Sequence, residues 1–288
     1  MINLISARPA ERITTYPSIV DVQEISGTSE GQATIQLWED ICGEPAGFTL
    51  LDGPVLAFEI SPQVDFDDLA SQMINWAKGQ LASTDWSGYE SIGLETACRE
   101  EDIGRIVFLE RRGFVAQPVR TLHFVRSLDK SIPKPCLPDG FLIRPINGEG
   151  EAQEWVRLHR AAHRTETMTV DFRLAMMRTP DYKRDLDLVA VSPEDQLAAY
   201  VVCYISEEEN RLREQKVGHT DPVATHPDFQ GKGLARALLY AGFERLKACG
   251  MEFAEVSTWG ENIAMIRTAE SAGYSLYSTT ICFKNMRS

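Results

Sequence analysis

The amino-acid sequence predicts an α/β protein, with a mixed sheet flanked by helices, that is built from two copies of one unit. Apolar strand-like runs alternate with amphipathic helical patterns through both halves of the chain. A proline-rich segment at residues 127–140 divides the 288 residues almost evenly, because proline at this density interrupts helices and central strands. A helix late in each half ends in the same Gly-aromatic pattern.

The second half is predicted to follow the order β-α-α-β-β-β-α-β-α-β-β. Its clearest helix, at residues 233–250, repeats leucine and alanine along one face and ends at Gly250. The strand at 219–227 is expected to be irregular, since Pro222 offers no backbone N–H. The predicted elements occupy residues 141–146, 149–163, 170–179, 186–205 (a hairpin), 219–227, 233–250, 253–259, 262–273 and 274–284 (one or two strands).

The first half runs in a similar order from residue 33 onward. Its predicted elements occupy residues 33–51 (a hairpin), 55–61, 66–81, 89–97, 100–113 and 121–128. The last helices of the two halves align at one constant spacing, which favours two copies of one fold over a chance likeness of two amphipathic helices. The aligned pairs are Asp102 with Asn262, Leu109 with Ala269, Gly113 with Gly273, and Phe114 with Tyr274.

Composition and charge disfavour several classes of partner. The formal net charge is −13, whereas nucleic-acid binding needs a basic face. A negative field attracts cationic amines, although a well-solvated acidic surface is the more common reason for such a charge. The N-terminus lacks a continuous apolar run, no stretch has transmembrane length, and the six cysteines and five histidines do not cluster as zinc ligands do. We expect a cytoplasmic protein with reduced, mostly buried thiols that binds no metal, nucleic acid or membrane.

The stretch HPDFQGKGLARALL, at residues 226–239, puts small residues between a strand and a helix. The free N–H groups and the dipole of a helix N-terminus attract anions, and small side chains let a phosphate approach the backbone. A Walker A loop is excluded because Leu234, not Lys-Ser or Lys-Thr, follows Gly233. A dinucleotide fingerprint is excluded because Arg236 stands where its third glycine belongs.

The segment QGKGLA resembles the Q/R-x-x-G-x-G/A signature of the GNAT superfamily of acyl-CoA-dependent N-acyltransferases. VATHP before it, the asparagine-to-Gly-aromatic helix after it, and the order of elements strengthen the resemblance over residues 140–288. The first half resembles the family only in outline. The resemblance implies two tandem GNAT-like domains: a degenerate one at 1–127, a Pro-rich linker at 128–139, and a GNAT N-acetyltransferase domain at 140–288.

The same resemblance implies where acetyl-CoA, or another acyl-CoA, binds as co-substrate. The strand before the loop would hydrogen-bond the pantetheine arm, and the loop and helix start would hold the pyrophosphate. Asn262 stands where the family often has an asparagine that contacts the CoA arm, and it is equally interpreted as a helix N-cap. The residues expected to bind are Val223, Ala224, Thr225, Gln230, Gly231, Lys232, Gly233, Leu234, Ala235 and Asn262.

The catalytic acid and base are predicted on different grounds. His219 stands where several family members carry a glutamate base, and imidazole titrates near neutrality. Asp221 would face the same side of a regular strand and would orient the ring or bind a cationic amine. The alternative for His219 is a solvent-exposed strand histidine. Ala269 stands where the family places a tyrosine acid, so water, Tyr274 or Ser271 would have to serve, or the protein is catalytically silent.

The first half lacks the phosphate cradle. Its equivalent stretch, PQVDFDDLA at residues 62–70, has three aspartates and no glycine, which favours the helix but repels a pyrophosphate. Residues 1–33 also look too short for the opening strand and two helices of the family. We therefore expect this half to support the fold or wall the substrate cleft without binding CoA.

The leading hypothesis is that the second half transfers acetyl from acetyl-CoA to a small-molecule or peptide amine by direct attack. The alternative is a non-catalytic protein that binds or senses acyl-CoA, a hypothesis motivated by Ala269. A nucleotide hydrolase is disfavoured, because the loop lacks the Lys-Ser/Thr pair. The acceptor, the acyl-chain length and the oligomeric state are not predicted.

Overall fold

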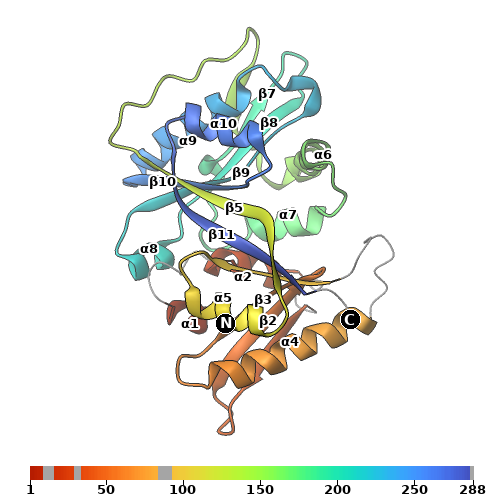
Figure 1. The fold of residues 1–288 in the computed structure, drawn as a ribbon. Coiled ribbons are helices and arrows are strands. Elements are labelled where there is room, and N and C mark those ends of the chain that lie inside the picture. Colours follow the sequence, from red (N-terminus) through yellow and green to blue (C-terminus); the bar gives the residue numbers. More distant parts are fainter. Residues whose placement is uncertain (9–15, 29–33, 84–92, 286–288) are drawn as a thin grey trace. The chain divides into compact units, whose positions relative to one another are not determined.

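The computed structural model describes residues 1–8, 16–28, 34–83 and 93–285, and it has the predicted mixed α/β fold (Figure 1). The chain forms two compact units. Unit 1 draws on residues 1–22, 29–122 and 278–288, and unit 2 on residues 23–28 and 123–277. The helix α2 (Ile19–Ser26) and the strands β5 (Val115–Ser127) and β11 (Ser275–Asn285) therefore contribute residues to both units. The domain boundaries at 127/128 and 139/140 stay a prediction.

Unit 1 is a mixed sheet with the strand order β1-β2-β3-β4-β11-β5. The first three strands form an antiparallel meander, β3 and β4 run parallel, and β11 pairs antiparallel with β4. The hairpin and strands predicted for the first half are thus confirmed, although residues 89–92 of the predicted strand at 89–97 lie outside the described residues. The elements are α1 (Ile2–Ser6), α2 (Ile19–Ser26), β1 (Ile35–Glu39), β2 (Pro45–Asp52), β3 (Val55–Ile60), α4 (Phe66–Ser83), β4 (Leu94–Arg99) and α5 (Ile103–Arg111).

Helix α4 covers one face of the unit 1 sheet. Leu69, Met73, Ala77 and Leu81 recur three or four residues apart and are buried against β2, β3 and β4. The helix begins just after Asp65, whose Oδ1 accepts a hydrogen bond from the backbone N–H of Asp68 at 3.1 Å. Asp65 is therefore the N-cap that satisfies an otherwise unpaired donor of the first turn.

Replacing Asp65 by Ala removes this N-cap and is expected to lower the free energy of unfolding by about 1 kcal/mol. Urea denaturation followed by circular dichroism measures the loss. Asp67→Ala is the matched control, because Asp67 lies in the same first turn but interacts with the helix dipole, so its loss is a few tenths of a kcal/mol. Equal losses in the two variants would contradict the capping role.

Unit 2 is a sheet with the strand order β5-β10-β9-β8-β7-β6. Strands β6 to β9 pair antiparallel, and β9 and β10 pair parallel. Helices α6 and α7 lie on one face and α9 on the other, with α10 against α9 (Figure 1). The elements are β6 (Leu142–Pro145), α6 (Ala152–His163), α7 (Val170–Met177), β7 (Asp187–Val191), β8 (Leu197–Tyr204), α8 (Glu207–Arg213), β9 (Val217–Thr225), α9 (Leu234–Ala248), β10 (Phe253–Trp259) and α10 (Ile263–Ser271).

Helix α9 packs tightly on β8 and β9. A Cβ at Gly218 of β9 would overlap the side chain of Leu246 of α9, and a Cβ at Gly242 of α9 would lie 2.7 Å from Sγ of Cys203 on β8. Both contacts are closer than real Cβ atoms show, so a side chain at either position would displace Leu246 or Cys203. The α9 face of these two strands is therefore filled by protein.

The one or two strands expected at 274–284 are the single strand β11. The structure corrects the sequence prediction at two other places. Helix α8 was not predicted; its signal is the Ser206-x-x-Glu209 capping pattern, and the Ser206 hydroxyl does accept from the Glu209 N–H at 3.4 Å. Cys42, Cys136 and Cys249 are exposed, so the expectation of buried thiols is wrong for these three, although all six cysteines are free.

The repeat predicted in the last helices is confirmed in local geometry. Asp102 and Asn262 are both N-caps, with φ, ψ of −84°, 69° and −82°, 69°, and their side chains accept from the backbone N–H three residues on. The glycines that follow α5 and α10 have φ of +80° and +90°. The next aromatic N–H bonds the carbonyl five residues earlier in each unit, at 3.0 and 3.1 Å.

Candidate active site

Strands β9 and β10 part in the middle of unit 2. Their parallel register covers three residue pairs and ends at His219 opposite Glu255, although β9 continues to Thr225 and β10 to Trp259. The register of β9 against β8 also shifts, between the pairs Val201–Val223 and Cys203–Thr220. This bulge falls on the Asp221-Pro222 segment, where proline offers no N–H to a neighbouring strand. The later part of β9 therefore pairs with β8 on one side only.

The free side of β9 carries backbone groups available to a ligand. The N–H of His226 donates to the carbonyl of Ala198 on β8, and alternation along the strand turns Ala224 toward β8 as well. Val223 and Thr225 then present their N–H and C=O groups away from β8, and the Thr225 carbonyl accepts from Gln230 Nε2 at 3.4 Å. Of the three residues predicted on this strand, Val223 and Thr225 have the suitable backbone orientation.

The loop from β9 to α9 is open and shaped by two glycines. Gly231 and Gly233 have φ of +76° and +79°, a region that favours glycine, and a Cβ at either position would meet nothing within 4 Å. Gly233 is the N-cap of α9 and has no side chain with which to cap it. The N–H groups of the first turn of a helix have no partner inside the helix, so this 15-residue helix directs free donors and its positive dipole end into open space.

The remaining loop residues have distinct environments. Leu234 is buried and anchors the start of α9, and Ala235 is half-buried beside it. The side chain of Lys232 does not extend freely from the loop, since its Nζ lies 5.6 Å from the ring centre of Phe229 and 5.8 Å from that of Phe141. These two rings meet edge to face, and they hold the Lys232 ammonium beside the glycine loop by cation–π attraction.

The equivalent place in unit 1 is closed. There the strand β3 leads to α4 through Asp65, whose carboxylate accepts a hydrogen bond from a backbone N–H of the first turn. In unit 2 the corresponding N-cap is Gly233, which has no side chain to accept such a bond. Asp67 and Asp68 add two further carboxylates to the same turn. Negative charge at a helix N-terminus stabilises the helix and repels an anionic ligand, so the two units differ in the chemistry of this turn.

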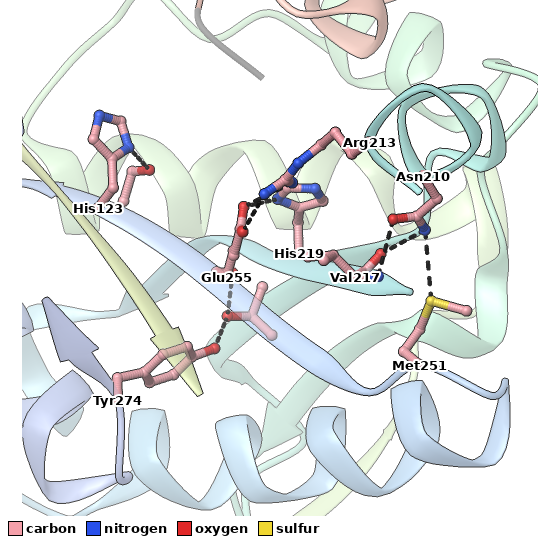
Figure 2. Close-up of polar contacts among 10 residues, drawn as sticks. His123, Asn210, Arg213, Val217, His219, Met251, Glu255 and Tyr274 are labelled. Atoms are coloured by element: carbon pink, nitrogen blue, oxygen red, sulfur yellow. Dashed lines mark hydrogen bonds and ion pairs between the residues drawn. The ribbon is translucent and has the colours of Figure 1, made fainter. Parts of the chain in front are cut away.

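His219 lies at the point where β9 and β10 part, within a cluster of polar side chains (Figure 2). Its ring stacks on Tyr204 of β8, with ring centres 4.6 Å apart, and its side chain is 11% exposed. Its Nδ1 lies 4.0 Å from a carboxylate oxygen of Glu255. Arg213, the last residue of α8, donates to both oxygens of this carboxylate at 2.8 and 3.3 Å. The interpretation of His219 as a solvent-exposed strand histidine is therefore wrong.

The electrostatics keep the imidazole neutral and the carboxylate charged. Burial lowers the pKa of His219, and the charge of Arg213 lowers it further, while Glu255 acts in the opposite direction. Burial alone would raise the pKa of Glu255, but the charge that His219 carries when protonated and the bonds and charge of Arg213 outweigh it, so the pKa is lowered. A hydrogen bond from Tyr277 to the Glu255 carboxylate acts in the same direction.

The carboxylate acting on His219 is Glu255, which sequence reasoning did not single out, and not the expected Asp221. The bulge after Thr220 interrupts the regular alternation on which the expectation for Asp221 rested. The charge of Asp221 instead raises the pKa values of the Tyr200 and Tyr274 hydroxyls. Glu255 is the direct register partner of His219, and such a partner is set by the pairing of strands and not by local spacing.

The hydroxyl groups of Tyr274 and Ser271, the two candidate acids, lie in different environments. Tyr274 is buried and its hydroxyl lies 2.7 Å from that of Thr220, the first residue of β9 beyond the last β9–β10 pair (Figure 2). Burial raises the pKa of Tyr274 far above its ordinary value, so it remains a hydrogen-bond donor. Ser271 is exposed and donates to Thr268. Asn262 is exposed at the N-cap of α10, where its Oδ1 accepts from the Met265 N–H.

Two wider features concern metals and membranes. The described ranges hold no group of three or more His, Cys, Asp or Glu side chains placed to bind a metal ion. In the same part of the chain, no helix combines the length and hydrophobicity needed to cross a bilayer.

Two solved structures share the fold of the whole chain. A GCN5-related N-acetyltransferase from Sphaerobacter thermophilus matches 99% of this chain and 92% of its own, with a TM-score of 0.69 at 17% identity. A tandem GNAT protein from the clavulanic acid biosynthesis pathway matches 100% of this chain and 94% of its own, with a TM-score of 0.67 at 17% identity.

Relatives in sequence cover less of the chain. The mycothiol acetyltransferase of Propionibacterium freudenreichii is 32% identical over 172 residues, which are 56% of this chain and 54% of that protein. That of Nocardiopsis dassonvillei is 33% identical over 69 residues, 24% of this chain and 21% of that protein. The chain thus spans about half, or less, of the length of these curated relatives. The model of the acetyltransferase (GNAT) family matches residues 152–274, which contain the glycine loop and the parted strands.

Proposed function

We propose that unit 2 transfers an acetyl group from acetyl-CoA to the amine of a small molecule or peptide. The observation that carries the proposal is the open glycine loop at the N-terminus of α9, continuous with the unpaired side of β9. The loop offers N–H donors and positive potential for a pyrophosphate, and β9 offers backbone groups for an amide-containing arm. The names of the mycothiol acetyltransferases support acetyl transfer, and the acceptor of this chain is a separate question.

The acceptor is proposed to approach on the α6–α7 face of β9. The opposite face is filled by α9, which leaves no room for a Cβ at Gly218 or Gly242. His219 and Tyr204 lie on the α6–α7 face, where they would meet an incoming amine. Asp221 carries the negative charge that a protonated amine needs before it loses its proton.

His219 is proposed as the general base. The neutral imidazole accepts a proton at Nε2 from the amine nitrogen as the new N–C bond forms, and it returns this proton to the thiolate sulfur as the C–S bond breaks. Acetyl-CoA supplies the activated thioester. Glu255 faces Nδ1 and is held by Arg213, so it fixes the ring and stabilises the imidazolium.

The hydroxyl pair Thr220–Tyr274 is not proposed as a replacement for a tyrosine at position 269. Thr220 follows His219 along β9 and lies near Gly242 of α9, and Tyr274 packs edge to face on Phe243 of α9. The pair therefore lies on the α9 face, and we propose that the thiolate receives its proton from His219.

The overall proposal is tested by measuring CoA release from acetyl-CoA with a broad panel of amines. Turnover with at least one amine supports the acetyltransferase. The second candidate, an acyl-CoA sensor, is favoured by Ala269 alone, and it predicts that acetyl-CoA binds while no amine releases CoA.

Gly233→Glu is expected to abolish the stabilisation of the protein by acetyl-CoA in a thermal-shift assay, because it brings a side chain and a negative charge into the cradle. Gly250→Glu is the matched control. Gly250 ends the same helix, has φ of +86° and is equally open, so it carries the same backbone strain away from the loop. A normal acetyl-CoA shift in Gly233→Glu would remove the phosphate assignment.

His219→Gln is expected to lower kcat about 10²-fold near neutral pH, the usual contribution of a general base. The variant should bind acetyl-CoA as the parent protein does, because the cradle is unchanged. Isothermal titration calorimetry and steady-state rates separate the two effects, and an unchanged kcat would exclude His219 as the base.

The pH dependence of kcat/KM is expected to shift in opposite directions in Glu255→Gln and Arg213→Gln. The base must be deprotonated, so activity is lost as pH falls through the pKa of His219. Glu255 raises that pKa, so its removal moves the acid limb to lower pH; Arg213 lowers it, so its removal moves the limb to higher pH. Shifts in the same direction, or none, would contradict the pairing of His219 with Glu255.

A further inference from the structure

Three titratable side chains form a hydrogen-bonded chain on the α6 face of unit 2. His159 and His163 lie one turn apart on α6, with ring centres 4.4 Å from each other. The hydroxyl of Tyr200, on β8, lies between them, 2.7 Å from Nδ1 of His159 and 3.2 Å from Nε2 of His163. Nothing in the reaction described above uses these three groups.

The chemistry of the three groups makes the chain directional. A hydroxyl has one proton, so Tyr200 donates to one imidazole and accepts an N–H from the other. Each imidazole has an outer nitrogen, the one that does not bond Tyr200. When one ring gains a proton at its outer nitrogen, the proton of each hydrogen bond can move to its acceptor, and the other ring then loses a proton from its outer nitrogen. The direction of both hydrogen bonds is reversed after this exchange. No ion remains on Tyr200 after this exchange.

Both rings are neutral at rest and therefore ready to pass a proton. Burial, the neighbouring His163 and the charge of Arg173 lower the pKa of His159 to about 4. Burial also lowers the pKa of His163. The other charged groups that face the chain are Asp187 on β7 and Asp221 on β9, and both raise the pKa of Tyr200, which stays protonated.

The middle member of the chain lies beside the proposed CoA segment. Tyr200 is the register partner of Ala224 on β9, and the Asp221 charge reaches its hydroxyl. The ring of His159 is half-buried and stacks on Trp155, whereas the residue His163, at the end of α6, is the more exposed of the two. The His163 end is therefore the end nearer to solvent.

We propose that His159, Tyr200 and His163 form a proton relay between the acceptor side of β9 and solvent. The inference rests on the proposed acetyl transfer. An amine that arrives as an ammonium ion loses two protons when it becomes an amide. One goes to the thiolate through His219, and the other passes from His159 through Tyr200 to His163 and into water. The three side chains are positioning and relay groups and do not touch the thioester.

The first test does not depend on turnover. Protonation of His163 makes its Nε2–H a permanent donor to Tyr200, so Tyr200 must donate to His159 and fix its tautomer. Imidazole nitrogen NMR is expected to show the His159 tautomer changing over the same pH range in which His163 titrates. Tyr200→Phe should abolish this coupling while keeping the ring in the core. A His159 tautomer that ignores the protonation of His163 in the parent protein would overturn the relay.

The second test measures acyl transfer. Tyr200→Phe and His163→Gln are expected to lower kcat about tenfold in dilute buffer, less than loss of the base itself, because water replaces part of the path. Added imidazole should restore the rate of His163→Gln, and a merely structural role would not respond to imidazole. Tyr240→Phe is the control, since it removes one tyrosine hydrogen bond, to the Ser271 carbonyl, on the opposite face.

The outcomes separate the two proposals. A parent protein that turns over no amine overturns the acetyl transfer and the role of the relay in it. An active parent protein without NMR coupling, or a His163→Gln variant that imidazole does not rescue, overturns the relay alone.

Discussion

The separation of β9 from β10 after the pair His219–Glu255 is the constraint on which the rest of the site depends. A parallel pair that stayed in register would use the backbone groups of Val223 and Thr225 in its own ladder, and no surface for an extended ligand would remain. The bulge and Pro222 interrupt pairing at that point. The last paired residues are then both buried by the sheet and adjacent to the opening, which is why His219 is largely desolvated yet close to the proposed acyl group.

Helix α9 both closes one face of β8 and β9 and supplies the N-terminus that lies beyond the end of β9. Its side packs against β8 and β9 so closely that Gly218 and Gly242 admit no side chain, which closes one face of the opening. Its N-terminus, uncapped at Gly233, supplies the donors and the dipole at the far end of β9. One rigid element thus carries the phosphate cradle at its N-terminus and packs beside the strand that carries His219. The opposite face, under α6 and α7, is the one on which we propose that the acceptor approaches.

Features encoded locally could be predicted from the sequence, and features that depend on pairing could not. The glycine loop, the Asp102 and Asn262 caps and the hairpins follow from neighbouring residues, and the structure confirms their geometry. Glu255 reaches His219 through the register of two strands 36 residues apart, so no spacing rule indicates it. Helix α8 had a readable signal in the Ser206 capping pattern, but the charged run that follows resembles a surface loop. The contact of Tyr200 with His159, 41 residues away, also depends on tertiary packing.

The two units differ in the N-cap of one helix, which is Gly233 for α9 and Asp65 for α4. Asp102 and Asn262 cap their helices with nearly the same backbone angles, so the repeat is retained in detail at the end of each unit. At the earlier helix start, Gly233 leaves the first-turn donors unpaired, which costs helix stability that an anionic ligand can restore. Asp65 uses the equivalent donor internally, so the helix of unit 1 gains stability without a ligand. A helix start cannot be both well capped and an anion site, and we propose that unit 1, having the cap, serves as support and binds no acyl-CoA.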